Sequence, residues 1–296
     1  MVLAGTVSTI ISTILSFPYL LDITIFLFLL ISTSLGYAKG FWRGTFRFIF
    51  VVIVLLIAWF TLLDKCATFI NESFLSTINV KVKVGTYEAS SIKEVVELTI
   101  KNASELGETL PAKYSNEAYV SALSLSISKS IAWAMIVFIV QFISWIISGI
   151  LYFLVIRLII PNKVRKVKLK LLGALMGLAQ ALVVTFAFMI SFSSISPAIE
   201  TIKNPGKGIF TWCNQITQAA VNALNPNNSM LSPFAETLEK QMSSKQYDFT
   251  LEGDESTYVF KNELKEFFKF FSDFNDKILE EESSTGIIDN SYEVNY

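Results

Sequence analysis

Residues 171–181, LLGALMGLAQA, decide the fold, because they open a long apolar run and place Gly173, Gly177 and Ala181 four residues apart. Residues at this spacing lie on one face of a helix. Small side chains on that face let two helix backbones approach closely, which favours packing in lipid, where no hydrophobic force drives helices together. The segment therefore predicts a membrane helix that packs tightly against another helix.

The composition of the whole chain agrees with a membrane protein. Its 296 residues are 52% hydrophobic and 17% charged, and the mean hydropathy is +0.52. The hydrophobic fraction is higher, and the charged fraction lower, than in an ordinary soluble domain. The 24 Lys and Arg nearly balance the 25 Asp and Glu, so the net charge predicts no nucleic-acid partner.

Four uncharged apolar runs predict four core transmembrane helices, at approximately residues 23–38, 48–63, 131–156 and 171–199. The first two runs are shorter than the ~20 residues that cross a bilayer. Each can be extended by a terminal charge, Asp22 or Arg47, which reaches water at headgroup level. The expected fold class is thus an all-α integral membrane protein.

The charges of the loops predict the orientation, because short loops rich in Lys and Arg stay in the cytoplasm. The loop between the first two spans contains Lys39, Arg43 and Arg47, and that between the last two contains six basic residues; neither contains an acid. The region 64–130 carries 7 Lys and 8 acids, and the tail from residue 196 carries 8 Lys and 16 acids. Both termini are therefore expected on the side of the membrane away from the cytoplasm.

The first 21 residues are uncharged and follow helical spacing until Pro18. We expect an interfacial or re-entrant helix here, and a fifth span is the alternative. The predicted organisation is an interfacial helix at 1–21, a first transmembrane hairpin at 22–63, an extracytoplasmic loop at 64–130, a second hairpin at 131–199 and an extracytoplasmic helical tail at 200–296.

The regions outside the spans are patterned rather than featureless. Alternation from Ile78 to Val84 predicts a strand, and the apolar spacing of residues 92–103 predicts a helix, so the loop is expected to be mainly helical and folded. The tail has an amphipathic helical stripe made of Phe260, Leu264, Phe267, Phe271, Phe274 and Ile278. We expect this stripe to dock on the loop; a partner helix or the membrane surface is the alternative.

Polar residues within the spans are few, and no ionisable group lies at mid-depth, which argues against an ion-coupled transporter. Gln141 and Gln180 are expected to form a hydrogen bond between helices, although they could line a narrow uncharged pore. Trp145 is expected to be buried in the middle of its helix.

The sequence gives no support for an enzyme. It contains no His, which is the commonest general base and metal ligand. Cys66 and Cys213 lack a metal-binding spacing, and they either remain unpaired or form a disulfide. We therefore predict no catalytic residues, no metal and no cofactor.

A second set of small residues repeats every four positions around the first turn: Ser32, Gly36, Gly40 and Gly44. Ordinary close packing among the four helices is expected here, and a hinge or a tight contact between copies is the alternative.

Residues 22–43, DITIFLFLLISTSLGYAKGFWR, contain an ordered pattern. Asp22 precedes the first span, a turn follows, and Arg43 leads into the second span. The turn consists of Gly36, Tyr37, Lys39, Gly40 and Phe41. Later, a span ends at Arg157 and a basic linker leads into the glycine-rich last span. This pattern, which covers most of residues 20–195, resembles the colicin V production (CvpA) family. The chain departs from the family pattern at three points. It has Gly44 where family members usually have an acid, and its basic linker lacks the Asp-Arg pair often seen before the last span. The loop at 64–130 and the tail are also longer than in the usual form of the family.

The resemblance implies a non-enzymatic accessory protein of the bacterial inner membrane that supports toxin production or export and envelope homeostasis. Its implied partners, besides the lipid bilayer, are another copy of itself or another membrane protein, bound by helix packing. The alternative function is an oligomeric pore or gated channel.

Overall fold

The computed structural model describes residues 20–84, 87–105, 109–151, 153–154, 169–199, 247–251 and 256–271. This part of the chain is 85% helical. Four of its helices are long and apolar enough to cross a membrane, namely Asp22–Lys39, Phe41–Glu72, Glu117–Ile147 and Lys170–Ser191. The prediction of a mostly helical protein with four candidate spans is confirmed.

The first hairpin consists of α2 (Leu20–Lys39) and α3 (Phe41–Ile57). A single residue, Gly40, joins them with a φ of 79°, a left-handed conformation that glycine adopts without strain. α3 continues through one π-helical turn, η1 (Ala58–Leu62), into α4 (Leu63–Glu72). The helix therefore extends well past residue 63, where the apolar run ends.

The second hairpin consists of α7 (Glu117–Leu151) and α10 (Lys170–Ile199). The side chain of Asn116 caps α7 by accepting a hydrogen bond from the backbone N–H of Ala118 at 3.0 Å. α7 therefore begins within the region predicted to be a loop. Its first turns are Ser-rich, which is why hydropathy alone places the start of the apolar run at residue 131.

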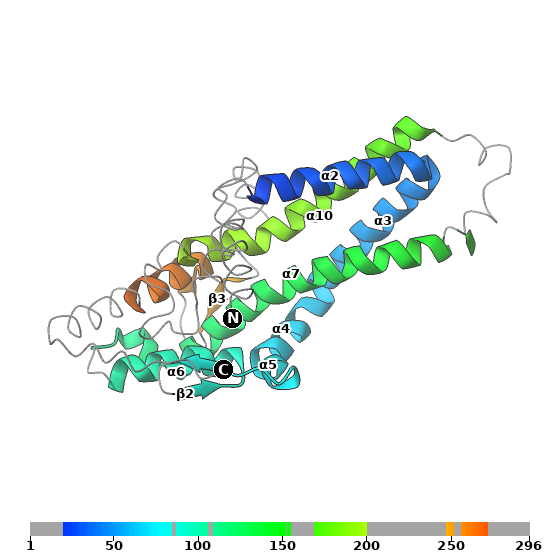
Figure 1. Cartoon of the computed structure of the whole chain (residues 1–296). Helices are drawn as coiled ribbons and strands as arrows, with labels where there is room; N and C mark the ends of the chain where they lie inside the picture. Colours follow the sequence, from blue (N-terminus) through cyan, green and yellow to red (C-terminus); the bar gives the residue numbers. More distant parts are fainter. Residues whose placement is uncertain are drawn as a thin grey trace, which may run out of the picture.

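Helix α10 lies against α2, α3 and α7. The α2–α3 turn, the C-terminal end of α7 and the N-terminal end of α10 lie together at one end of the bundle (Figure 1). At the other end lie α4, α5 (Phe74–Thr77) and α6 (Ile92–Glu105), as Figure 1 also shows. The helix ends that flank the two basic loops of the sequence thus lie at the same end of the bundle.

The segment between the hairpins contains a small antiparallel sheet. β1 (Val82–Val84) pairs with β2 (Tyr87–Ala89), with Val82 opposite Ala89. The strand predicted to start at Ile78 is therefore shorter than expected, because the chain is still turning out of α5 at that point. Helix α6 follows as predicted. A short 3₁₀ helix, η2 (Ala112–Ser115), then leads to α7.

The start of α6 is fixed by a capping box. The backbone N–H of Glu94 donates to Ser91 Oγ at 3.1 Å. In return, the backbone N–H and the hydroxyl of Ser90 donate to Glu94 Oε2 at 2.6 and 2.7 Å. These hydrogen bonds lower the pKa of Glu94 below its ordinary value.

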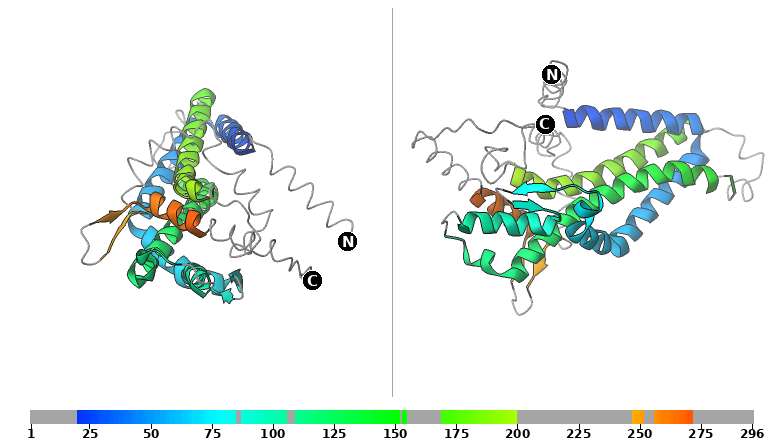
Figure 2. Two further views of the ribbon diagram at one scale, coloured as in Figure 1. Left: turned by 90° about the vertical axis from the view of Figure 1, so that its left-hand side faces the viewer. Right: turned by 60° about the horizontal axis from the view of Figure 1, so that its bottom comes forward.

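The described part of the tail contains two short paired strands, β3 (Phe249–Thr250) and β4 (Thr257–Tyr258), and a helix over residues 260–271. We call this the tail helix; it lies at the same end of the molecule as α6 (Figure 2, orange). The name "cap" is used below for α5, the β1–β2 hairpin, α6, η2 and the tail residues 247–251 and 256–271.

Candidate functional site

The closest helix contact joins α2 to α10 through glycines. A Cβ atom placed on Gly177 would lie 3.2 Å from the Cα of Gly36, and one on Gly173 would lie 2.7 Å from the carbonyl carbon of Gly40. The carbonyl oxygen of Ser32 faces Gly177 in the same contact. The two small-residue stripes seen in the sequence therefore meet each other within one chain.

The remaining members of the two stripes extend this contact. A Cβ atom on Gly44 would lie 3.2 Å from the Cβ of Met176, and Ala181 is completely buried. Position 44, which carries glycine and no acid, is therefore a place where α3 packs closely on α10.

Other residues of the first turn lie at its rim. Phe41 contacts Trp42 edge to face, with ring centroids 5.3 Å apart. Tyr37 is exposed, and Lys170 Nζ lies 5.3 Å from its ring centroid. Asp22 is in the first turn of α2, where the helix dipole favours an acid.

A group of cations meets an aromatic ring at the same end of the bundle. Lys39 Nζ lies 5.2 Å, and Arg47 Cζ 5.8 Å, from the ring centroid of Trp145. These distances allow cation–π attraction. The prediction that Trp145 is buried is wrong, because its side chain is 52% exposed. α7 starts earlier than the apolar run, so Trp145 lies near the end of this helix.

Arg47 is a functional candidate that the sequence pattern did not reveal, because its side chain was expected to reach water at the end of its span. It is only 7% exposed and lies between α3 and α7. Its Nε donates to Ser144 Oγ at 3.4 Å, and the Ser144 hydroxyl donates to the Gln141 carbonyl oxygen at 2.8 Å. The four-residue spacing of Arg43 and Arg47 on α3 was the available signal that the two share a face.

Hydrogen bonds link α7 and α10 in the bundle interior. Gln180 Nε2 donates to Gln141 Oε1 at 3.1 Å, as expected from the sequence. The indole N–H of Trp133 donates to the Ala187 carbonyl at 2.7 Å, and Ser130 Oγ donates to the Ser191 carbonyl at 2.9 Å. These contacts tie the two helices together along their length.

An apolar pocket of about 270 Å³ lies between α3, η1, α7 and α10. Its lining includes Val52, Leu56, Trp59, Trp133, Phe186 and Ile190. The Trp59 and Trp133 rings meet edge to face at 4.5 Å. Trp59 also lies 6.2 Å from the Tyr247 ring, so aromatic contacts join the bundle to the cap.

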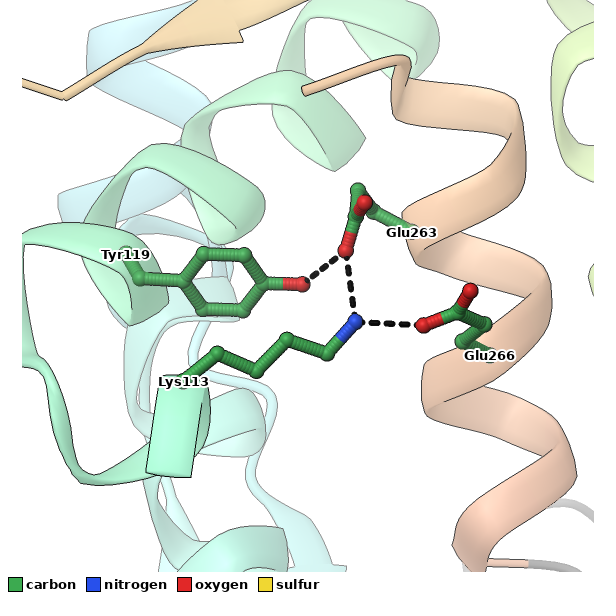
Figure 3. A network of polar contacts seen from close by, with 4 residues as sticks. All are labelled: Lys113, Tyr119, Glu263 and Glu266. Carbon is green, nitrogen blue, oxygen red and sulfur yellow. Dashed lines mark hydrogen bonds and ion pairs between the residues drawn. The ribbon is translucent and has the colours of Figure 1, made fainter. Parts of the chain in front are cut away.

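The tail helix is attached to the rest of the cap by a polar network (Figure 3). Lys113 Nζ of η2 pairs with Glu263 at 2.8 Å and with Glu266 at 2.5 Å. The hydroxyl of Tyr119, from the start of α7, donates to the same Glu263 oxygen at 2.5 Å. One carboxylate therefore links three segments of the chain.

The apolar stripe of the tail helix packs against the same segments. Phe260, Leu264, Phe267 and Phe271 are each at most 4% exposed. Tyr114 of η2 lies 5.9 Å from the Phe267 ring and 6.0 Å from the Phe271 ring. The described part of the stripe, from Phe260 to Phe271, thus docks within the chain, on η2 and the first turns of α7.

The network perturbs two groups in η2. Burial lowers the pKa of Lys113, but its hydrogen bonds to Glu263 and Glu266 outweigh this effect and raise the pKa above 10.5. Burial raises the pKa of the Tyr114 hydroxyl above 10.0, and the charges of Glu266 and Glu263 raise it further. Both groups therefore stay protonated at neutral pH.

Several predicted residues lie outside the described residues: Arg157, Cys213, Phe274, Ile278 and the segment 1–19. Cys66 is half-buried on α4. Both alternatives for the cysteines therefore stay predictions.

Taken together, fold and contacts define a mostly helical protein with four candidate membrane spans, a glycine-mediated helix contact and a folded cap. No family model, curated protein or solved structure matches the chain.

Proposed function

We propose that this protein is a non-enzymatic accessory protein of the bacterial cytoplasmic membrane. The role is the one that the resemblance to the colicin V production family implies, namely support of toxin production or export and of envelope homeostasis. The protein acts by helix packing with itself or with another membrane protein, and both of its termini and its cap lie outside the cytoplasm.

The observation that carries this proposal is the firm connection of the cap to the bundle. Helix α7 runs without a break from the cap into the bundle. Ser126 Oγ of α7 donates to the Tyr247 carbonyl of the tail at 2.8 Å, and Tyr247 lies against Trp59. Such a connection suits a protein that holds a binding surface at a fixed position above the bilayer.

The faces of the spans that remain exposed supply a surface for other membrane components. On α2 these are Phe26, Leu27, Leu30 and Ile31, and on α7 they are Phe138, Phe142 and Ile146. In contrast, the small-residue stripes are occupied by the contact within the chain. Association through helices would therefore use the larger apolar side chains.

The proposal is tested by purifying the whole chain in mild detergent and recording from planar bilayers. We expect no discrete conductance, because Gln141 and Gln180 bond each other instead of facing an open path. Discrete conductance steps that change in Gln180→Leu, but not in Lys93→Gln, a control at an exposed position of α6, would contradict the accessory role and favour the pore.

A cellular test addresses the biological role. A strain lacking the gene should export less of a peptide toxin and become sensitive to detergent, and the wild-type gene should restore both properties. Unchanged export and unchanged detergent resistance in the deletion strain would contradict the proposal.

A further inference from the structure

Three cations lie together where α2, α3 and α7 meet. We define the cationic cluster as Lys39, Arg43 and Arg47 with Ser144 and Trp145. Arg43 Nη2 lies 3.2 Å from the position a Cβ atom would take on Gly149 of α7. The three cations are close enough to repel one another electrostatically.

Arg47 contributes a buried donor to this cluster. Its Nη2 atom is buried and has no hydrogen-bond partner among the described residues, whereas its Nε contacts Ser144. A buried donor of a charged group is costly to leave unpaired. The arrangement is therefore suited to an acceptor that is not part of the described chain.

The two hairpins themselves provide no carboxylate for this purpose. The sequence has no Asp or Glu between residues 23 and 63, nor between residues 118 and 199. Asp22 precedes Lys39 by 17 residues, and Asp64 follows Arg47 by 17 residues. At 1.5 Å per helical residue, each acid lies roughly 25 Å away, at the opposite end of its helix.

The surroundings of the cluster indicate what kind of anion reaches it. Phe142 and Ile146, on either side of Ser144 and Trp145 in α7, are exposed and apolar. Trp145 is itself exposed, and Trp prefers the boundary between headgroups and acyl chains. The cluster residues come from the end of α2, the first half of α3 and the last turns of α7. These segments meet at one end of the bundle, which is the end predicted to face the cytoplasm.

We propose that the cationic cluster binds the phosphate of an anionic phospholipid in the cytoplasmic leaflet. Guanidinium groups donate paired hydrogen bonds to phosphate oxygens, and Lys39 adds a further positive charge. The acyl chains of the same lipid cover the neighbouring apolar face of α7. Basic pockets between membrane helices bind anionic headgroups in this way. This inference does not depend on the accessory role.

Native mass spectrometry of the purified full chain in detergent tests the site directly. The probes are phosphatidylglycerol, phosphatidylcholine with identical acyl chains, and inorganic phosphate. The variants are Arg47→Gln and the double variant Lys39→Gln/Arg43→Gln. The control is Lys93→Gln/Lys101→Gln, which removes two exposed charges from α6. The double variant retains the buried Arg47, so its lipid binding can be measured even if Arg47→Gln does not fold.

We expect wild type and the control to prefer phosphatidylglycerol over phosphatidylcholine. Both cluster variants should lose roughly tenfold or more of the affinity for phosphatidylglycerol, as for a lost charged hydrogen bond. Equal binding of the two lipids by wild type, or wild-type preference in the double variant, would overturn the proposal. Displacement of phosphatidylglycerol by millimolar inorganic phosphate would overturn the assignment to a lipid, because the site would then recognise free phosphate.

Discussion

At the scale of single residues, the absence of side chains at three glycines is the most informative feature. Gly36, Gly173 and Gly177 are buried where α2 meets α10, and backbone atoms occupy the space that any side chain would need. The spacing of the glycines predicted close packing. It could not predict that the two stripes pair with each other, because the choice of partner helix depends on the complete arrangement of the bundle.

Gly36→Leu, Gly173→Leu and Gly177→Leu should each destabilise the bundle by on the order of 1 to 3 kcal/mol, because the helices must separate to admit the new side chain. The measurement is the melting temperature of the purified protein in detergent. Ala38→Leu is the matched control, because Ala38 is on the exposed side of the same helix. Equal melting temperatures for Gly36→Leu and Ala38→Leu would show that the contact is not tightly packed.

Glu94 supplies a residue-scale prediction of pH dependence. The hydrogen bonds from Ser90 lower the folded-state pKa of Glu94 below its ordinary value of 4.5. The ionised carboxylate therefore stabilises α6 fully when the pH is above 4.5. The stabilisation should be lost as the pH falls from about 4.5 through the lower folded-state value. Thermal unfolding measured between neutral and acidic pH should therefore show a weaker acid dependence in Glu94→Gln than in wild type. Identical pH profiles would contradict the role of this cap.

At the scale of elements, hydropathy predicted the number of spans but not their ends. The hydropathy of α4 and of the first turns of α7 is lowered by four polar residues, Asn71, Ser124, Ser126 and Ser128. All four side chains are nevertheless buried, and Ser128 Oγ donates to Asn71 Oδ1 at 3.2 Å. Polar side chains that bond across a helix interface cannot be distinguished from loop residues by composition.

The tail helix was predictable in part from its sequence. Its 4-3 spacing predicted an apolar face, and the structure shows that this face packs on η2 and α7. The polar half of the contact was not predictable, because Lys113 and Glu263 are 150 residues apart and only tertiary structure brings them together.

Phe271→Asp should release the tail helix, because it places a charge in a fully buried aromatic contact. The loss should be at least about 3 kcal/mol, as for removal of a buried Phe side chain. Limited proteolysis of intact cells with an externally added protease measures the release. Lys269→Asp, at an exposed position of the same helix, is the control. Cleavage between residues 256 and 271 at equal rates in wild type and Phe271→Asp would show that the helix is not docked.

Alkaline pH should loosen the same contact. The pKa values of Lys113 and Tyr114 are raised in the folded state, so their stabilisation is complete below about pH 10 and is lost as the pH rises further. Proteolytic protection of the tail helix should therefore decrease above pH 10. In Lys113→Arg the decrease should be smaller, because a guanidinium keeps its charge and only the contribution of Tyr114 is then lost. No change in protection up to pH 11 would contradict the assignment.

At the scale of the whole molecule, the direction of the chain across the membrane determines which compartment each end of the bundle faces. The structure places the α2–α3 turn, the C-terminal end of α7 and the N-terminal end of α10 at one end and the cap at the other. The orientation itself follows only from the charge distribution. It decides whether the cap meets extracytoplasmic partners and whether the cationic cluster faces the cytoplasmic leaflet.

Cysteine labelling in intact cells tests this orientation most directly. Single cysteines are introduced at Ser76, exposed after α4, and at Lys170, exposed at the start of α10, in a background with Cys66→Ser and Cys213→Ser. An impermeant maleimide should label position 76 in intact cells and position 170 only after the membrane is opened. Labelling of position 170, but not of position 76, in intact cells would contradict the account.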